Sequence, residues 1–217
     1  MIYTALGDSI TFGENASSMT KGYPHLIGSA LQSSSHRVRV NVLARPGWSS
    51  GDLLDAVIWN GLPVISQSGV ISVWIGGVDL MNTALQSLKS KHPLNLRRTT
   101  TDYKRHLSAL FTRIKRVSLA RIVCCTQYNP FPNSPLAVNS IHQLNQITSE
   151  IAHRCGVVVA PTHTWFEDKQ ADLIYGYHKG KIEDALSGTL PIHPNDRGHH
   201  VIAKGLASYL IPPNTKA

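Results

Sequence analysis

A serine hydroxyl follows the first apolar run of the chain and has the position of a nucleophile. Ile2–Leu6 is a β-rich run that predicts a strand, and Gly7-Asp8-Ser9-Ile10 comes directly after it. A glycine turn there places the Ser9 hydroxyl where a strand meets a helix. Backbone N–H groups at such a turn can face a developing oxyanion. We therefore predict that Ser9 can attack a carbonyl group.

A histidine near the other end of the chain could serve as the general base. His193 opens the segment His193-Pro194-Asn195-Asp196-Arg197-Gly198-His199, just before a predicted final helix over 195–210. A neutral imidazole can take the proton of a serine hydroxyl during attack. Ser9 and His193 together would perform acyl transfer.

A second serine has a competing motif. Gly47-Trp48-Ser49-Ser50-Gly51 fits Gly-x-Ser-x-Gly, the nucleophile elbow of α/β-hydrolases, and lies between a predicted strand and a predicted helix. That fold places the elbow after several more strands than the one or two that precede Ser49, and it has an upstream glycine-rich loop that is not found here. Ser49 remains the weaker alternative to Ser9.

Neither a metal nor another cofactor is predicted. His199 and His200 are adjacent, so they point to different helix faces, and no carboxylate completes a ligand set with His193. The pair Gly76-Gly77 predicts a close-approach turn rather than a phosphate cradle, because no dinucleotide or Walker pattern surrounds it.

The elements that would position these residues alternate between strand and helix. Strands are predicted over 2–6, 38–43, 70–75, 122–126 and 157–160, and helices over 23–32, 51–60, 100–117, 141–154 and 195–210. This alternation favours an α/β fold, a doubly wound three-layer α/β/α sandwich on a five-stranded parallel sheet. We expect one domain over 1–217. Loops over 89–96, 129–137 and 166–190 would carry substrate selectivity.

Composition excludes several classes of protein. The chain has 217 residues, of which 42% are hydrophobic and 16% charged, so neither a disordered protein nor a coiled coil fits. Cys124 and Cys125 are adjacent in an apolar run, so we expect reduced, buried thiols. No apolar run has transmembrane length, and the N-terminus lacks the features of a signal peptide. We expect a cytoplasmic protein, although secretion after removal of a leader stays open.

Positive charge is concentrated in one segment. Residues 97–121 hold eight Lys or Arg against the single acid Asp102, which is +7 of the formal net charge of +8. A solvated helix face is the simplest interpretation. An acidic-surface or nucleic-acid binder is a lesser alternative, but interleaved aromatic residues and known nucleic-acid-binding motifs are missing, so no nucleic-acid partner is expected.

The order of the motifs resembles the GDSL or SGNH hydrolase family, over residues 4–205. Its blocks correspond to Leu6-Gly7-Asp8-Ser9-Ile10-Thr11, Ala44-Arg45-Pro46-Gly47-Trp48-Ser49-Ser50, Gly76-Gly77-Val78-Asp79 and the His193 segment. The resemblance implies a flavodoxin-like SGNH-hydrolase fold and hydrolysis of a small-molecule ester without a cofactor. It implies that Ser9 is the nucleophile and His193 the base. The N–H groups of Ser9 and Gly47 would form the oxyanion hole.

Two positions depart from the family pattern. Val78 stands where the family has the Asn that donates to the oxyanion, and Leu190 stands where it has the Asp that holds the histidine. We therefore expect a slow Ser-His dyad, with the Leu190 carbonyl as the group that orients His193 and Asp184 as a less favoured substitute. A non-catalytic binding protein of the same fold is the alternative.

Asp8 and Asp79 are the two acidic residues inside these motifs. Each follows a glycine at the end of a predicted strand. Aspartate is common in turns and at helix starts, where its carboxylate accepts backbone hydrogen bonds. We predict that both support the shape of the catalytic loops.

Overall fold

The computed structural model describes residues 1–32, 37–90, 96–186 and 188–211, with the side chains of 85 and 87–90 excepted. These residues contain a five-stranded parallel sheet in the order β2-β1-β3-β4-β5, which confirms the predicted fold class. The strands are β1 (Ile2–Gly7), β2 (Arg39–Ala44), β3 (Val70–Trp74), β4 (Arg121–Cys125) and β5 (Val158–Ala160). The strand order reverses between β1 and β3, and such a reversal is where open α/β sheets bind ligands.

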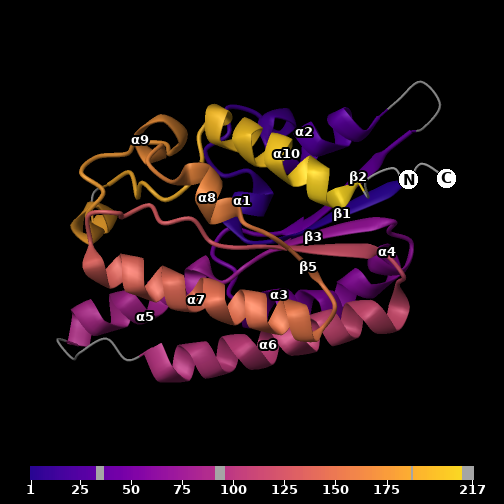
Figure 1. The fold of residues 1–217 in the computed structure, drawn as a ribbon, viewed down its shortest axis with the longest axis horizontal. Helices are drawn as coiled ribbons and strands as arrows, with labels where there is room; N and C mark the ends of the chain where they lie inside the picture. The colour runs from indigo at the N-terminus through magenta and orange to yellow at the C-terminus, as the bar shows by residue number, and fades with distance from the viewer. Residues whose placement is uncertain (33–36, 91–95, 187, 212–217) are drawn as a thin grey trace.

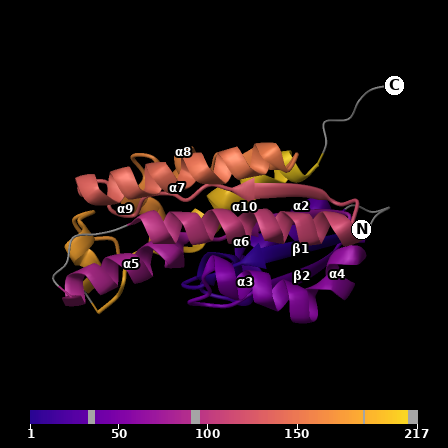
Figure 2. The ribbon, with the colours of Figure 1, turned by 90° about the horizontal axis from the view of Figure 1, so that it is seen from below.

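Helices cover both faces of the sheet (Figures 1 and 2). One face carries α1 (Ser9–Phe12), α2 (Tyr23–Leu31), α8 (Thr162–Phe166), α9 (Gln170–Leu173) and α10 (Asp196–Leu210). The other face carries α3 (Ser50–Ala56), α4 (Leu62–Ser66), α5 (Gly77–Ser90), α6 (Leu96–Val117) and α7 (Pro135–Arg154). The result is the predicted three-layer sandwich.

The core is divided by the sheet into two apolar clusters. Successive strand side chains point to opposite faces, so Ala5 packs with the α2 and α10 layer while Leu6 packs with the α3, α6 and α7 layer. Burial on both faces explains why β1, β3 and β4 are nearly continuous apolar runs. Cys124 and Cys125 lie buried in β4 without a disulfide bond, and burial raises the pKa of the Cys124 thiol to about 12.

The structure adds helical turns that the sequence analysis did not predict. α5 is absent from the predicted helices, because its opening Gly76-Gly77 suggested only a turn; Asp79 in its first turn favours the helix dipole. α7 begins at Pro135 rather than 141, since proline suits the first helical turn. α6 begins at Leu96 rather than 100.

The predicted loops and helix ends also differ in detail. The predicted helix over 51–60 is split, because α3 continues through a π-helical turn, Val57–Gly61, into α4. The predicted loop over 166–190 contains α9 and a 3-10 helix, Ile182–Leu186. Positions 91–95 of another predicted loop lie outside the described residues.

Gly7 allows β1 to turn sharply into α1. A Cβ atom at this position would collide with Thr11 Oγ1 and with the Trp74 carbonyl oxygen of the neighbouring strand β3. A residue with a side chain would therefore push the following Ser9 away from β3. Among the described residues, no helix combines the length and apolar character needed to cross a membrane.

Candidate active site

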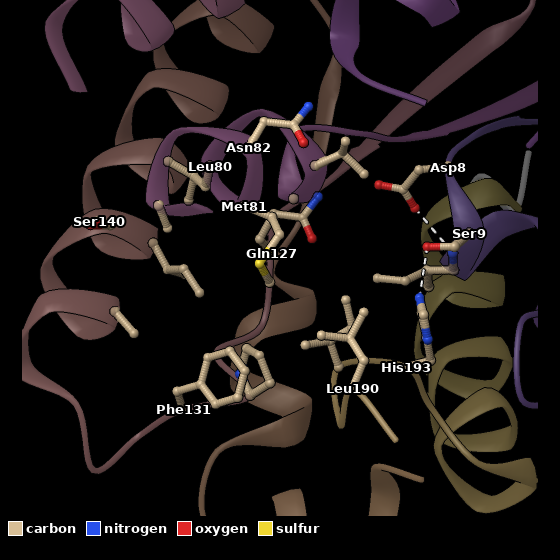
Figure 3. A pocket seen from close by; sticks show the side chains of 18 of the residues that line it. Asp8, Ser9, Leu80, Met81, Asn82, Gln127, Phe131, Ser140, Leu190 and His193 are labelled. Carbon is tan, nitrogen blue, oxygen red and sulfur yellow. Dashed lines mark hydrogen bonds between the residues drawn. The ribbon is translucent and has the colours of Figure 1, made fainter. Parts of the chain in front are cut away.

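Ser9 and His193 meet at the carboxyl edge of the sheet. Ser9 is the first residue of α1, and His193 lies just before α10. The distance from Ser9 Oγ to His193 Nε2 is 2.9 Å, and Ser9 is only 7% exposed (Figure 3). This is the geometry of a serine nucleophile hydrogen-bonded to its general base.

The other ring nitrogen of His193 is bound by a residue that the sequence analysis missed. His193 Nδ1 lies 3.1 Å from Asn15 Oδ1. An amide oxygen accepts, so Nδ1 carries the proton and Nε2 is left to accept from Ser9. The sequence-based candidate is thereby corrected: the Leu190 carbonyl accepts from Ile192 N–H at 2.8 Å instead. The less favoured Asp184 accepts from the backbone N–H groups of residues 179 and 181.

The first turn of α10 holds the loop that carries Asn15. Asp196 accepts from Ser17 N–H at 2.8 Å, from Ser17 Oγ at 2.7 Å and from Lys21 Nζ at 2.7 Å. His199 Nε2 lies 3.4 Å from the Glu14 carbonyl oxygen. The same helix therefore fixes the partner of His193 and, through the preceding residues, His193 itself.

Backbone hydrogen bonds fix the segment just before α10. The Tyr128 hydroxyl donates to the Ile192 carbonyl oxygen at 2.5 Å, and Tyr175 N–H donates to the His193 carbonyl oxygen at 2.9 Å. The imidazole is thus positioned by the segment after β4 and by the loop after α9, and little reorganisation is needed before proton transfer.

Burial sets the protonation state of the base. Desolvation, with a smaller contribution from the positive charge of His199, lowers the pKa of His193 from 6.5 to about 4. Both causes disfavour the imidazolium. The neutral base is therefore the form present at neutral pH.

The expected pH profile follows from this shift. We expect kcat/KM for a p-nitrophenyl ester to rise with pH around a midpoint near 4 and to stay level above it, because only neutral His193 accepts the serine proton.

The same shift affects folding. In the unfolded chain His193 binds a proton more tightly than in the folded protein, so the free energy of unfolding declines as pH falls from 6.5 toward 4. Circular dichroism at each pH is the control. A midpoint at 6.5 in folded protein would contradict the proposed burial effect.

Two carboxyl groups shape the loops around Ser9. Asp8 Oδ1 caps α1 by accepting from Ile10 N–H at 3.0 Å, and burial raises the pKa of Asp8 to about 7. Asp79 accepts from Ser50 N–H at 2.9 Å and Ser50 Oγ at 2.6 Å, which ties the start of α3 to the first turn of α5. Burial also raises the pKa of Asp79.

The other predicted positions divide between the cavity and a helix cap. Gly47, Val78 and Leu190 line the same cavity as Ser9 and His193. Gly47 has φ +82°, in the left-handed region that glycine tolerates. Ser49 instead caps α3: its hydroxyl donates to Asp52 Oδ2 at 2.6 Å and accepts from Asp52 N–H at 3.3 Å.

An apolar cavity opens beside Ser9. It measures about 420 Å³, which is in the range of small-molecule sites. Its walls come mainly from α5, the start of α7 and the loop before α10. The apolar side chains lining it include Leu80, Met81, Phe131, Leu136, Ala137, Ile141, Ile182, Leu190 and Ile192. The arrangement can hold an apolar group next to the nucleophile.

The structure also shows the surroundings of His199, which was considered as a metal ligand, and of the basic residues on α6. His199 is buried: its Nδ1 accepts from Tyr23 N–H at 3.3 Å, and its ring stacks on that of Tyr23. In the part of the chain that the structure describes, no group of three or more His, Cys, Asp or Glu could hold a metal ion. On the basic helix α6, Arg98 and Arg105 pair with Asp102, while Lys104 pairs with Glu150 of α7.

Sequence comparison identifies the family. A sequence profile of the GDSL-like Lipase/Acylhydrolase family matches residues 5–201. The chain therefore belongs to this family of ester hydrolases. It is also 23% identical over 214 residues to the spore germination lipase LipC of Bacillus licheniformis, covering 94% of this chain and 93% of that protein.

Solved structures of ester hydrolases share the fold. The lipase Lip_vut3 from a goat rumen metagenome superposes with a TM-score of 0.81 at 20% identity, covering 96% of this chain and 97% of the other. The acetylxylan esterase Axe2 from Geobacillus stearothermophilus gives 0.73 at 20% identity, with 98% and 94% covered. At these identities the similarity supports the fold.

Proposed function

We propose that this protein is a serine ester hydrolase that cleaves a carboxylic ester through an acyl-enzyme on Ser9. The observation that carries the proposal is the 2.9 Å contact between Ser9 Oγ and His193 Nε2 at the wall of the apolar cavity. Asn15 has the role of a positioning residue, because it acts on the reaction through His193.

Acylation begins with attack of Ser9 Oγ on the ester carbonyl carbon. His193 Nε2 takes the hydroxyl proton as the new C–O bond forms, and the carbonyl electron pair moves to oxygen. The imidazolium then returns the proton to the leaving alcohol as the tetrahedral intermediate collapses. In the second half-reaction, water attacks the acyl-enzyme with the same base, which releases the acid and restores Ser9.

The backbone N–H groups of Ser9 and Gly47 are the proposed oxyanion donors. Ser9 N–H lies at the start of α1, and the left-handed conformation of Gly47 turns the β2–α3 loop toward the cavity. Fixed donors of this kind stabilise the transition state at no cost of reorganisation.

The site destabilises the imidazolium form of His193, which must form during catalysis. Both nitrogens of His193 have neutral partners, Ser9 and Asn15, and burial disfavours positive charge. A carboxylate partner would offset that cost, whereas an amide oxygen orients the ring with less stabilisation of its charge. We therefore expect turnover slower than that of a carboxylate triad.

The cavity lining favours an apolar acyl chain over acetate. Each CH₂ buried against α5 and α7 adds about 0.8 kcal/mol of binding, or roughly a fourfold gain in kcat/KM if it persists in the transition state. We expect kcat/KM to rise along a p-nitrophenyl series from acetate to a chain of about six to eight carbons, and then to fall once the cavity is full.

A cavity-filling variant provides the control for this chain-length preference. Ala137 is buried at the cavity wall on α7. Ala137→Phe should reduce kcat/KM for the octanoate ester while sparing the acetate ester. An equal loss on both esters, or a flat chain-length series in the parent protein, would exclude this cavity as the acyl site.

Covalent labelling tests the proposed nucleophile directly. A fluorophosphonate probe should modify Ser9, as mapped by peptide mass spectrometry, and should abolish esterase activity in proportion to labelling. Ser49, whose hydroxyl is bonded to Asp52, should stay unmodified. A folded protein that takes no label and hydrolyses no ester of the series would instead support the non-catalytic binding alternative.

A further inference from the structure

Gln127, two residues after the end of β4, is held in place by two hydrogen bonds between its backbone and the side chain of Asn145. Gln127 N–H donates to Asn145 Oδ1 at 2.7 Å, and Asn145 Nδ2 donates back to the Gln127 carbonyl oxygen at 2.8 Å. Asn145 belongs to α7, so the helix clamps the carboxyl end of the strand. Gln127 is only 5% exposed, and its side chain lines the same cavity as Ser9.

A third hydrogen bond fixes which way the Gln127 amide points. Trp74 Nε1–H donates to Gln127 Oε1 at 2.8 Å. An indole nitrogen can only donate, so the amide oxygen must occupy this end and the amide nitrogen the other. Nε2 is the one buried side-chain nitrogen or oxygen in the described residues that has no hydrogen-bond partner. Native structures rarely leave such a donor unused.

The amide group that carries this buried donor lies beside the reaction site. Figure 3 shows the Gln127 amide directed at the same open space as the Ser9 hydroxyl and the Asp8 carboxyl group. A Cβ atom built on Gly77 would lie 3.6 Å from Gln127 Oε1 and 3.9 Å from Asp8 Oδ2. The amide is therefore beside the first residue of α5, next to Val78.

We propose that Gln127 Nε2–H donates to the oxyanion of the tetrahedral intermediate and so takes the part that the side chain of Val78 cannot perform. When Ser9 Oγ bonds to the carbonyl carbon, the electron pair that moves to oxygen becomes the acceptor for this N–H, while the serine proton goes to His193 Nε2. This inference rests on the proposed esterase function. It assigns a third donor, from the segment after β4, to an oxyanion hole whose other donors lie after β1 and β2.

Removal of the amide provides the first test. Gln127→Met should lower kcat for a p-nitrophenyl ester by about 10- to 30-fold with little change in KM, because the bond forms only in the transition state. The inhibition constant of an alkyl trifluoromethyl ketone, which forms an oxyanion on Ser9, should rise by a similar factor. Gln146→Met is the matched control, since Gln146 is exposed on α7 and contacts His142.

A second variant guards against simple loss of folding. Gln127→Glu retains an oxygen for the Trp74 N–H and has no donor once its carboxyl group is ionised. At a pH where it is ionised, its kcat should fall at least as far as that of Gln127→Met. Thermal melting of each variant checks that the fold is kept. Wild-type kcat and inhibition constants in folded Gln127→Met would overturn the assignment.

Restoring an amide on α5 provides a readout that a structural role would not give. Val78→Asn should raise kcat by a larger factor in the Gln127→Met background than in the parent enzyme, because only there does its amide replace a missing donor. Independent, multiplicative effects of the two substitutions would overturn the shared role. If the parent protein shows no Ser9-dependent hydrolysis, the proposed function fails along with this inference. If hydrolysis is present and Gln127→Met is inert, only the inference fails.

Discussion

Ser9→Ala is expected to reduce ester hydrolysis by at least about 10³-fold, to the limit of the assay. The substitution removes the atom that becomes acylated and leaves His193 Nε2 without its 2.9 Å partner. The oxyanion donors and the cavity remain, so the residual rate would measure binding and electrostatic stabilisation alone. The measurement is kcat/KM for the preferred p-nitrophenyl ester, with an active-site titration of the parent enzyme.

Ser49→Ala is the matched control, because the same change is made at the rival serine. Ser49 and Asp52 form a capping box at the start of α3. The hydrogen bond between Ser9 and His193 does not involve Ser49. Loss of the cap should cost about 1 kcal/mol of stability and leave most of the activity. The opposite pattern, with activity lost at Ser49 and kept at Ser9, would transfer the nucleophile to the elbow motif.

The central strands of the sheet were predictable because they are buried on both faces. Val70–Trp74 and Arg121–Cys125 consist mostly of apolar residues. Such short apolar runs can be recognised as buried strands in the sequence without any turn motif beside them. α5 was not predictable in this way. Its apolar residues Leu80 and Met81 line the cavity, although Leu80 also packs against the core, so they give no clear helical stripe.

The two ends of the candidate active site could be predicted from local motifs. Ser9 follows a strand and His193 precedes a helix, and parallel strands deliver such residues to one edge of the sheet. The two residues are far apart in sequence, but the sheet topology brings both to the same edge. The identity of the pair was therefore available before any coordinates.

Asn15 and Gln127 were not predictable because their roles depend on orientation. Asn15 lies in an irregular loop with φ +62°, a conformation that asparagine tolerates, and its sequence neighbours give no sign of a histidine partner. Gln127 differs from an ordinary polar residue only because Trp74 fixes its amide. In both cases three-dimensional contacts, rather than residue type or spacing, define the function.

Asn15→Gly is expected to lower kcat/KM by roughly 10²-fold. The change removes the oxygen that holds Nδ1–H at 3.1 Å, so His193 can adopt the wrong tautomer or rotate away from Ser9. Glycine accepts the left-handed backbone of residue 15 without strain, so lost activity would not be a consequence of a distorted loop. Thermal melting close to that of the parent protein is the accompanying control.

Asn15→Asp tests the same contact in the opposite direction. A carboxylate at 3.1 Å from Nδ1 favours the imidazolium, so it should raise the pKa of His193 from about 4 and move the rising limb of kcat/KM to higher pH. The plateau should increase, by about tenfold, because the charged form made in the transition state is now stabilised. A structural role for Asn15 would leave the limb in place. An unmoved limb together with full activity in Asn15→Gly would therefore show that His193 is positioned by its backbone contacts alone.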